Sequence, residues 1–285
     1  IRGTNSINGF APLYVVDGMF TDNINYLNAN DIESFEILKD PSSLAIFGVR
    51  GANGVIIVTT KRAKMGQTVV NVNQSVGVKH VGHRMSLTNG PQFKELYNEQ
   101  LSNMGGDPFD YTYYQANTDW QDAIFRTAYS TKHSLSISGR TKSINYFVGA
   151  NYLYREGTII GSDFERYGLR VNLDGKRNRL KYGVSFSPSY SKSNYVGADA
   201  QYGGDGVIAS ALMAPPVFPV YNSDGSYNWD MNGFLRINTW DTQTNEVLNP
   251  VALALEIDDI REKLNILGNV FASYEFIKGL EYKIT

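Results

Sequence analysis

Cysteine is absent from the 285-residue sequence, so neither a disulfide framework nor a thiolate metal site can form within it. The absence fits an oxidising compartment of the cell envelope without demonstrating one. No continuous run of about eighteen apolar residues is present, which excludes a transmembrane helix. The 26 Lys and Arg and the 28 Asp and Glu are interspersed, without the basic face or stripe that neutralises phosphates. We therefore expect no nucleic-acid partner.

Proline is scarce, at 9 residues, whereas 19 Tyr, 14 Phe, 27 Gly and many Asn and Ser are present. This balance favours strands and polar loops over helices. A β-barrel in a membrane remains open, because its strands alternate and its mean hydropathy can be low. The sequence begins at Ile1 without a Met and looks cut at both ends, so we expect a piece of a longer protein.

The first part of the chain, residues 1–64, predicts a small α+β unit. An apolar strand lies at Pro12 to Gly18, and an extended segment lies at Ile32 to Leu38. After a break at Asp40-Pro41 come one or two helical turns and a glycine-punctuated loop, and the β-branched run Val55 to Thr60 closes the unit. These elements would also suit a nucleotide-binding crossover. The glycine loop lacks the Lys-Ser/Thr ending of a P-loop and precedes a strand, so tight turning is preferred over phosphate binding.

From Thr68 onward the sequence alternates between apolar and polar residues with a period of two, which predicts strands. Several of these segments reach the roughly nine to eleven residues that a strand needs to cross an outer membrane. Seven apolar faces are present: Val70 to Val78, His133 to Ile137, Ile144 to Tyr154, Tyr167 to Leu173, Leu180 to Tyr190, Leu264 to Phe276, and Leu280 to Ile284.

The connections between these segments alternate strictly between long and short. Short links at residues 141–143, 175–178 and 277–279 separate longer links at residues 80–129, 157–163 and 195–260. Short periplasmic turns and long extracellular loops are typical of an outer-membrane barrel. The first strand then runs outward, so residues 1–64 enter it from the periplasmic side.

Tyrosines occur at both predicted ends of the apolar faces. A soluble sandwich also alternates, but its apolar face would be a core rich in Leu, Ile and Val. Two aromatic girdles, one at each membrane interface, explain the tyrosines better. The outer set is Tyr152, Tyr154, Tyr167 and Tyr190, and the inner set is Tyr146, Tyr182, Tyr274 and Tyr282.

Five stretches are distinctive: PLYVVDG (Pro12 to Gly18), DIESFEILKD (Asp31 to Asp40), Ile46 to Gly48 with Arg50 to Ile56, NTDWQDAIF (Asn117 to Phe125), and the turn from Pro219 to Gly225. Together they resemble the SusC/RagA group of TonB-dependent outer-membrane transporters, in the plug as well as in the barrel.

The resemblance implies an all-β transmembrane antiparallel barrel with a small α+β plug domain at its N-terminal end. Residues 1–64 would be the later part of the plug, and residues 65–285 the first part of a barrel of 22 strands, of which about seven are present. Barrels of this size class carry a plugged lumen. The TonB-contacting segment is not expected in this chain.

The same resemblance implies TonB-dependent import of a glycan or oligopeptide nutrient across the bacterial outer membrane, in contact with outer-membrane lipid. A SusD-like surface lipoprotein would be the partner, and no cofactor is implied. An outer-membrane receptor or adhesin that binds a ligand without transport is the alternative, although an adhesin has no need of a plug. A soluble β-protein stands third.

The sequence contains no recognisable catalytic or metal site. His80 and His83 have no third histidine, cysteine or carboxylate cluster with them, so we assign no metal. On an extended segment Glu33 and Glu36 point to opposite faces, and no serine, histidine and acid set has recognisable spacing. We therefore predict that the chain is not an enzyme.

Candidate ligand contacts follow from the resemblance, since plug loops and outer barrel loops surround the substrate in this family. Aromatic faces beside amides and carboxylates suit sugar rings or peptides. The alternative for each aromatic is that it packs its loop against itself or against a partner. The candidates are Asn5, Ser6 and Asn8 in a first plug loop, Phe20, Asp22 and Asn23 in a second, and Tyr202, Asp205, Tyr227, Trp229 and Trp240 in the long outer loop.

Overall fold

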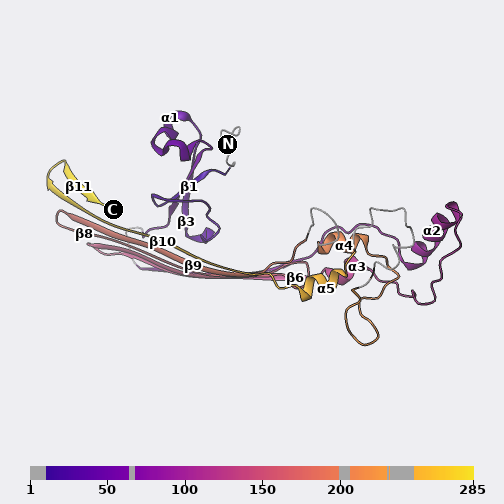
Figure 1. The fold of residues 1–285 in the computed structure, drawn as a ribbon. Helices are drawn as coiled ribbons and strands as arrows, with labels where there is room; N and C mark the ends of the chain where they lie inside the picture. The colour runs from indigo at the N-terminus through magenta and orange to yellow at the C-terminus, as the bar shows by residue number, and fades with distance from the viewer. Residues whose placement is uncertain (1–10, 64–67, 199–205, 230, 232–246) are drawn as a thin grey trace.

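The computed structural model describes residues 11–63, 68–198, 206–229, 231 and 247–285. These residues form a four-stranded sheet near the N-terminus and a long seven-stranded sheet. A cluster of helices and loops lies at one end of the long sheet (Figure 1). We call residues 11–63 the N-terminal unit. The described parts of residues 80–127 and 195–259 are called the loop cluster.

The N-terminal unit orders its strands β2-β1-β4-β3. Strand β1 (Leu13–Val16) pairs in parallel with β4 (Val55–Thr60), and the other two pairs are antiparallel. The short helices η1 (Ala29–Asp31), α1 (Pro41–Leu44) and η2 (Ala45–Gly51) complete it, with β2 (Met19–Thr21) and β3 (Ile32–Leu38). The prediction of strands, helical turns and a glycine loop is confirmed here.

The turn between β1 and β2 holds the parallel pair in place. Asp17 and Gly18 both have positive φ, 49° and 85°, as an Asp-Gly hairpin requires. The Asp17 carboxylate accepts hydrogen bonds from the Thr60 backbone N–H at 3.0 Å and from the Thr60 hydroxyl at 2.6 Å. The ends of β1 and β4 are therefore fixed to one another.

The long sheet contains seven antiparallel strands in sequence order, which confirms the predicted incomplete antiparallel sheet. Most strands have 11 to 18 residues, well beyond the usual five or six of soluble sheets. Their bounds are β5 (Val69–Lys79), β6 (Ala128–Arg140), β7 (Ile144–Glu156), β8 (Asp163–Arg177), β9 (Leu180–Asn194), β10 (Ile260–Ile277) and β11 (Leu280–Ile284).

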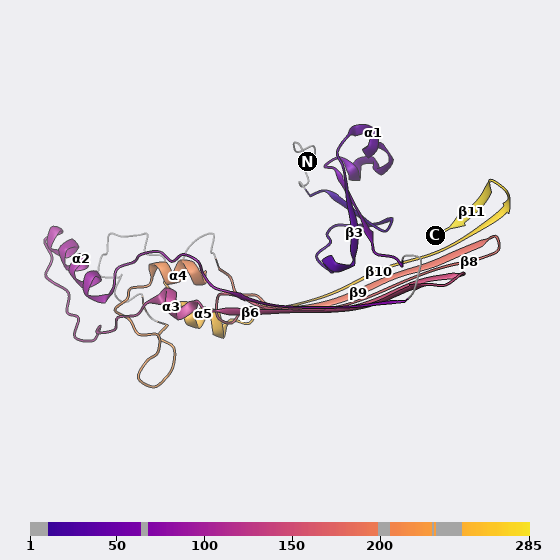
Figure 2. The same ribbon diagram turned by 180° about the vertical axis from the view of Figure 1, so that it is seen from behind.

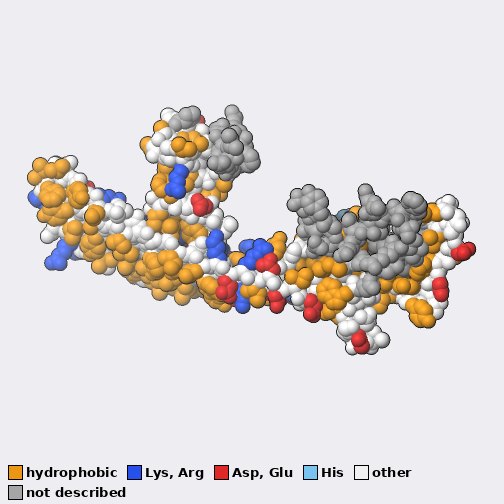
Figure 3. Space-filling model, in the orientation of Figure 1, with side chains coloured by type: hydrophobic (Ala, Val, Ile, Leu, Met, Phe, Trp, Pro, Cys, Tyr) orange, Lys and Arg blue, Asp and Glu red, His pale blue; other side chains and the backbone are white. Residues whose placement is uncertain are grey.

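The strand register sorts the side chains onto two different faces. Tyr152, Tyr167 and Tyr190 stand opposite one another across β7, β8 and β9, on an apolar face that is exposed. Ser134 and Ser189 belong to a row of small polar residues on the other face, and both are buried. Figure 3 shows the apolar band along the side of the sheet that faces away from the N-terminal unit. This arrangement is the reverse of a soluble sheet, which buries its apolar face.

The N-terminal unit stands on the concave face of the long sheet, and the loop cluster lies at the end away from the short turns (Figures 1 and 2). The cluster contains α2 (Gly90–Asn103), α3 (Trp120–Ile124), α4 (Val207–Met213) and α5 (Pro250–Glu256). Its core includes Trp120, Ile124, Val207, Val217 and Met231, all nearly or fully buried. Among the described residues no helix is long and apolar enough to cross a membrane.

Candidate functional site

The N-terminal unit is seated on the long sheet by polar groups. The Asn30 amide donates a hydrogen bond to the Ser134 hydroxyl at 3.2 Å, and the Arg166 guanidinium donates one to the Asn25 carbonyl. The Arg62 guanidinium forms an ion pair with Asp174 at 2.5 Å. Of the sheet residues, Leu267 packs against an apolar cluster of the unit. We call this polar interface the seat.

Asn172 is a central connection within the seat. Its amide nitrogen donates to the Thr60 hydroxyl at 3.2 Å, and its amide oxygen accepts from the Ser185 hydroxyl at 2.6 Å. Asn172 is 3% exposed, so water does not replace these bonds. Because Thr60 also bonds Asp17, the end of the parallel strand pair is joined to the sheet through one side-chain network.

Two oppositely charged residues are buried in the seat. Asp31 of the N-terminal unit and Arg170 of β8 are both almost fully buried. Burial raises the pKa of the Asp31 carboxyl, and the positive charges of Arg170, Lys61 and Lys132 act against that rise. The pKa rises on balance, because burial outweighs the attraction of these cations for the carboxylate.

The strand ladder is interrupted beside Arg170. Pro188 of β9 has no backbone N–H, and the pairing of β8 with β9 passes from Gly168 opposite Ser189 to Val171 opposite Phe186. The register is the same on both sides of this gap. A cavity of about 10 Å³ lies here under the N-terminal unit. That is close to the space one water molecule needs.

Several polar atoms around the seat have no hydrogen-bond partner among the described residues. Asn28 Nδ2, Asn151 Oδ1 and Ser189 Oγ are buried in this state, as is Arg170 Nη1. Asn28, Asn151 and Arg170 also line the small cavity. Buried polar groups normally have partners, and the small cavity has room for a water molecule that could serve the residues lining it.

The predicted ligand residues of the plug loops are partly visible. Asn5, Ser6 and Asn8 lie outside the described residues. Phe20 is 52% exposed and meets Phe47 edge to face, with ring centroids 6.3 Å apart. Asn23 shapes its own turn, since its side chain accepts from the Asn25 backbone N–H at 3.2 Å. Asp22 is exposed, so Phe20 and Asp22 have side chains free for a ligand, and their contact with one stays a prediction.

The predicted residues of the long outer loop are divided in the same way. Tyr202, Asp205 and Trp240 lie outside the described residues. Tyr227 packs against the core of the loop cluster and against Tyr221, with ring centroids 5.1 Å apart. Burial raises the pKa of the Tyr227 hydroxyl. Trp229 is 41% exposed and offers an open ring face. The structure does not bring these residues together with Phe20 and Asp22, which belong to the N-terminal unit.

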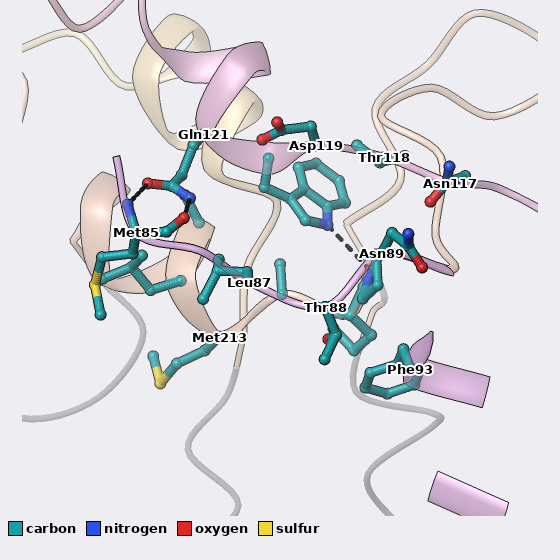
Figure 4. A pocket seen from close by; sticks show the side chains of 16 residues that line it. Met85, Leu87, Thr88, Asn89, Phe93, Asn117, Thr118, Asp119, Gln121 and Met213 are labelled. Carbon is teal, nitrogen blue, oxygen red and sulfur yellow. Dashed lines mark hydrogen bonds between the residues drawn. The ribbon is translucent and has the colours of Figure 1, made fainter. Parts of the chain in front are cut away.

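The loop cluster contains a pocket of about 270 Å³ that the sequence did not predict (Figure 4). The Trp120 indole N–H donates to the Pro215 carbonyl at 3.0 Å and closes one side. Gln121 bonds both backbone groups of Met85, at 3.0 and 2.8 Å. The rim includes the apolar side chains of Met85, Leu87, Phe93 and Met213, and the polar lining includes Asn89, Asn117 and Asp119.

A row of aromatic rings in contact with one another connects α2 to the core of the loop cluster. Phe93 stacks on Tyr97 with centroids 5.9 Å apart, and the contacts continue through Phe109 and Tyr114 to Phe218. Burial raises the pKa of the nearby Tyr111 hydroxyl to about 12. The ring of Phe93, which lines the pocket of the loop cluster, is therefore held in a network of aromatic contacts.

Comparison with known proteins defines the class. Residues 1–55 match the TonB-dependent Receptor Plug Domain. TonB-dependent receptor P3 of Formosa agariphila is 36% identical over 293 residues, covering 100% of this chain and 27% of the relative. TonB-dependent receptor SusC of Bacteroides thetaiotaomicron is 34% identical over 300 residues, covering 97% and 29%.

Solved structures agree with these relatives. The RagAB peptide importer in the open-open state superimposes with a TM-score of 0.74 at 25% identity, covering 99% of this chain and 34% of that chain. A further RagAB peptide transporter structure gives a TM-score of 0.76 at 24% identity, covering 99% and 35%. At 24% identity, the second of these similarities shows a shared fold only.

The N-terminal unit on the sheet, the exposed apolar face of that sheet and these matches identify the chain as the plug and part of the barrel wall of a TonB-dependent receptor. Within that class the chain is SusC/RagA-like. It spans 27 to 29% of the length of these two curated relatives. From here on the N-terminal unit is called the plug, and the seven-stranded sheet is called the wall. The boundary predicted between residues 64 and 65 falls within residues 64–67, outside the described residues.

Proposed function

We propose that this chain supplies the plug and adjoining wall of a transporter that imports a nutrient across the bacterial outer membrane. The observation that carries the proposal is the seat: a plug held by polar contacts on the inner face of a wall whose outer face is apolar. A plug that must rearrange during transport needs an interface whose hydrogen bonds can be replaced by bonds to water once the plug moves. The apolar outer face of the wall needs contact with lipid, which supports an outer-membrane location.

TonB is the proposed source of energy for import. A SusD-like lipoprotein over the loop cluster is the proposed partner. Both rest on the SusC-like and RagAB-like relatives, the latter named as a peptide importer. The substrate is proposed to be an oligosaccharide or an oligopeptide. Exposed Phe20 and Trp229 suit either class, because both present flat apolar faces for stacking.

A reversible crosslink across the seat tests the proposal. Asn30 and Ser134 touch through their side chains, and the sequence contains no cysteine. In the full-length protein we expect the pair Asn30→Cys and Ser134→Cys, joined by a short thiol crosslinker, to stop uptake of labelled oligopeptide and oligosaccharide mixtures. Reductive release of the crosslink should restore uptake.

The controls separate movement of the plug from damage to it. Asn30→Cys alone and Ser134→Cys alone, treated with the same reagent, should import normally. An uncoupler that dissipates the proton gradient should stop uptake in every variant while leaving surface binding. Uptake that survives both the crosslink and the uncoupler would contradict TonB-driven import through a moving plug. Surface binding without uptake in the parent would leave the receptor or adhesin alternative in its place.

A further inference from the structure

A second cavity, of about 410 Å³, lies at the end of the wall that carries the short turns. It is bordered by the segment leaving β4, by the turn between β6 and β7, and by the adjoining ends of β8 and β9. Figure 3 shows Lys and Arg side chains at this end of the sheet. The charged residues of its lining are Arg62, Arg140, Lys142, Lys176 and Lys181, with Asp174 as the acidic member.

Two of the five cations are already neutralised. Arg62 pairs with Asp174 at 2.5 Å, and Lys181 pairs with Glu281 at 2.9 Å. The side chains of the other three, Arg140, Lys142 and Lys176, form no ion pair with any residue of the described chain. Three unpaired positive charges thus converge on one cavity in a chain whose net charge is −2.

Hydrogen bonds fix the backbone segments that carry Lys142 and Lys176. The Thr141 hydroxyl oxygen accepts hydrogen bonds from the backbone N–H groups of Ser143 and Ile144, at 3.3 and 3.0 Å. The Lys176 backbone N–H donates to the Ser143 carbonyl at 2.9 Å and fastens the turn to β8. Lys142 and Lys176 therefore extend from a fixed frame, so an incoming anion need not order the backbone.

The position of the cavity connects it with the plug. Asp174 and Lys176 alternate with outward residues of β8 and share the inner face with Arg170 and Asn172. Arg62 belongs to the segment that leaves the plug. Tyr182 and Phe271 add aromatic surface beside the cations. The lining thus combines positive charge with an apolar face at the inner end of the wall.

We propose that this cavity binds the anionic group of a ligand, namely a carboxylate, sulfate or phosphate, through Arg140, Lys142 and Lys176. An anion there relieves the mutual repulsion of the three cations and competes with Asp174 for Arg62. An acidic substrate leaving the plug and a lipid phosphate of the inner leaflet carry the same chemistry. The substrate role rests on the proposed function, whereas anion binding by the cavity does not.

Calorimetric titration of the purified full-length protein with inorganic phosphate, at constant ionic strength in a neutral detergent, tests the site. The parent should bind saturably, and the triple variant Arg140→Gln, Lys142→Gln and Lys176→Gln should bind at least ten-fold more weakly. The charge-preserving triple Arg140→Lys, Lys142→Arg and Lys176→Arg should retain binding. The matched control, with the same loss of charge elsewhere, is the triple Lys39→Gln, Lys79→Gln and Lys263→Gln.

Equal phosphate affinity in the two Gln triples would overturn the proposal. Nanodiscs identify the source of the anion: phosphatidylglycerol discs that abolish the phosphate signal, when phosphatidylcholine discs do not, assign the cavity to lipid. If phosphate binds in both kinds of disc, the cavity is available to a substrate. Phosphate binding together with uptake that is insensitive to the uncoupler would refute TonB-driven import and leave the anion site standing.

Discussion

The plug and the loop cluster both pack at the long sheet, but they are built in opposite ways. The loop cluster has an apolar core, and its buried polar residue Asn249 is fully bonded: it donates to two carbonyls and accepts from two N–H groups of α5. The seat of the plug is polar and includes the buried residues Asn28, Asn172 and Ser189. An apolar core holds the loop cluster together, whereas a polar contact separates at lower cost because water replaces its hydrogen bonds.

The largest effect should come from the core of the loop cluster. Trp120→Ala removes a ring that is 3% exposed and its hydrogen bond to Pro215, so we expect the cluster to lose about 3–5 kcal/mol of stability. Hydrogen exchange of α3 and α4 in the full-length protein measures this loss. Tyr113→Ala, at an 89% exposed position, is the control and should change stability by less than about 0.5 kcal/mol. Similar losses in both variants would contradict an apolar core centred on Trp120.

Asn249→Ala should have the next largest effect. It removes the cap of α5 and the side-chain donor of the Asn228 carbonyl, whereas the Val220 carbonyl keeps the Asn228 backbone N–H at 3.1 Å. We expect a loss of about 2 kcal/mol, read from the same hydrogen-exchange experiment. The exposed Asn103→Ala provides the control on another helix. No change at α5 would mean that these bonds do not hold the cluster together.

Asn172→Ala is the corresponding change at the seat. It breaks bonds to Thr60 and Ser185, but the plug rests on other polar contacts, so we expect only about 1 kcal/mol. Hydrogen exchange of β4 in the full-length protein reports detachment of the plug. If Asn172→Ala released the plug as completely as Trp120→Ala opens the loop cluster, the contrast between the two regions would fail.

The smallest effect concerns pH. Burial raises the pKa of Asp31 above its ordinary value of 3.8, so the folded plug binds more protons than the unfolded chain between those two pKa values. Stability of the seat should therefore fall as pH rises from about 4 through the raised pKa. Asp31→Asn should flatten this dependence in hydrogen exchange of β3 and η1. Glu33→Gln, which removes an exposed carboxylate of β3, should leave it in place.

Sequence pattern predicted the strands well because alternation and turn residues are local signals. Leu180 to Tyr190 alternates residue by residue, and β9 extends that segment to Asn194. The seat was beyond prediction, because it joins Asn30 to Ser134 and Arg166 to Asn25, which lie 104 and 141 residues apart. Patterns within one sequence do not show which residues at such separations are in contact.

Helix α2 is a different kind of omission, since its signals were present. Asn89 and Gln92 form a capping box, and Pro91 stands in the first turn. The strand-like pattern on both sides nevertheless predicts a long loop over residues 80–129. The pocket of the loop cluster could not be predicted for the same reason as the seat, because its lining comes from segments far apart in the sequence. It assembles Met85, Asn117 and Met213 from three distant segments.

Strand β9 presents Ser185, Ser187 and Ser189 in succession toward the plug, all of them buried. Since a strand rises about 3.3 Å per residue, the same hydroxyl recurs about every 7 Å along the wall. A plug group displaced by one such step meets a chemical copy of the partner that it left. The plug therefore faces the same small hydroxyl group at regular intervals along β9, and the larger side chains of Arg166, Arg170 and Asn172 lie on the neighbouring strand β8.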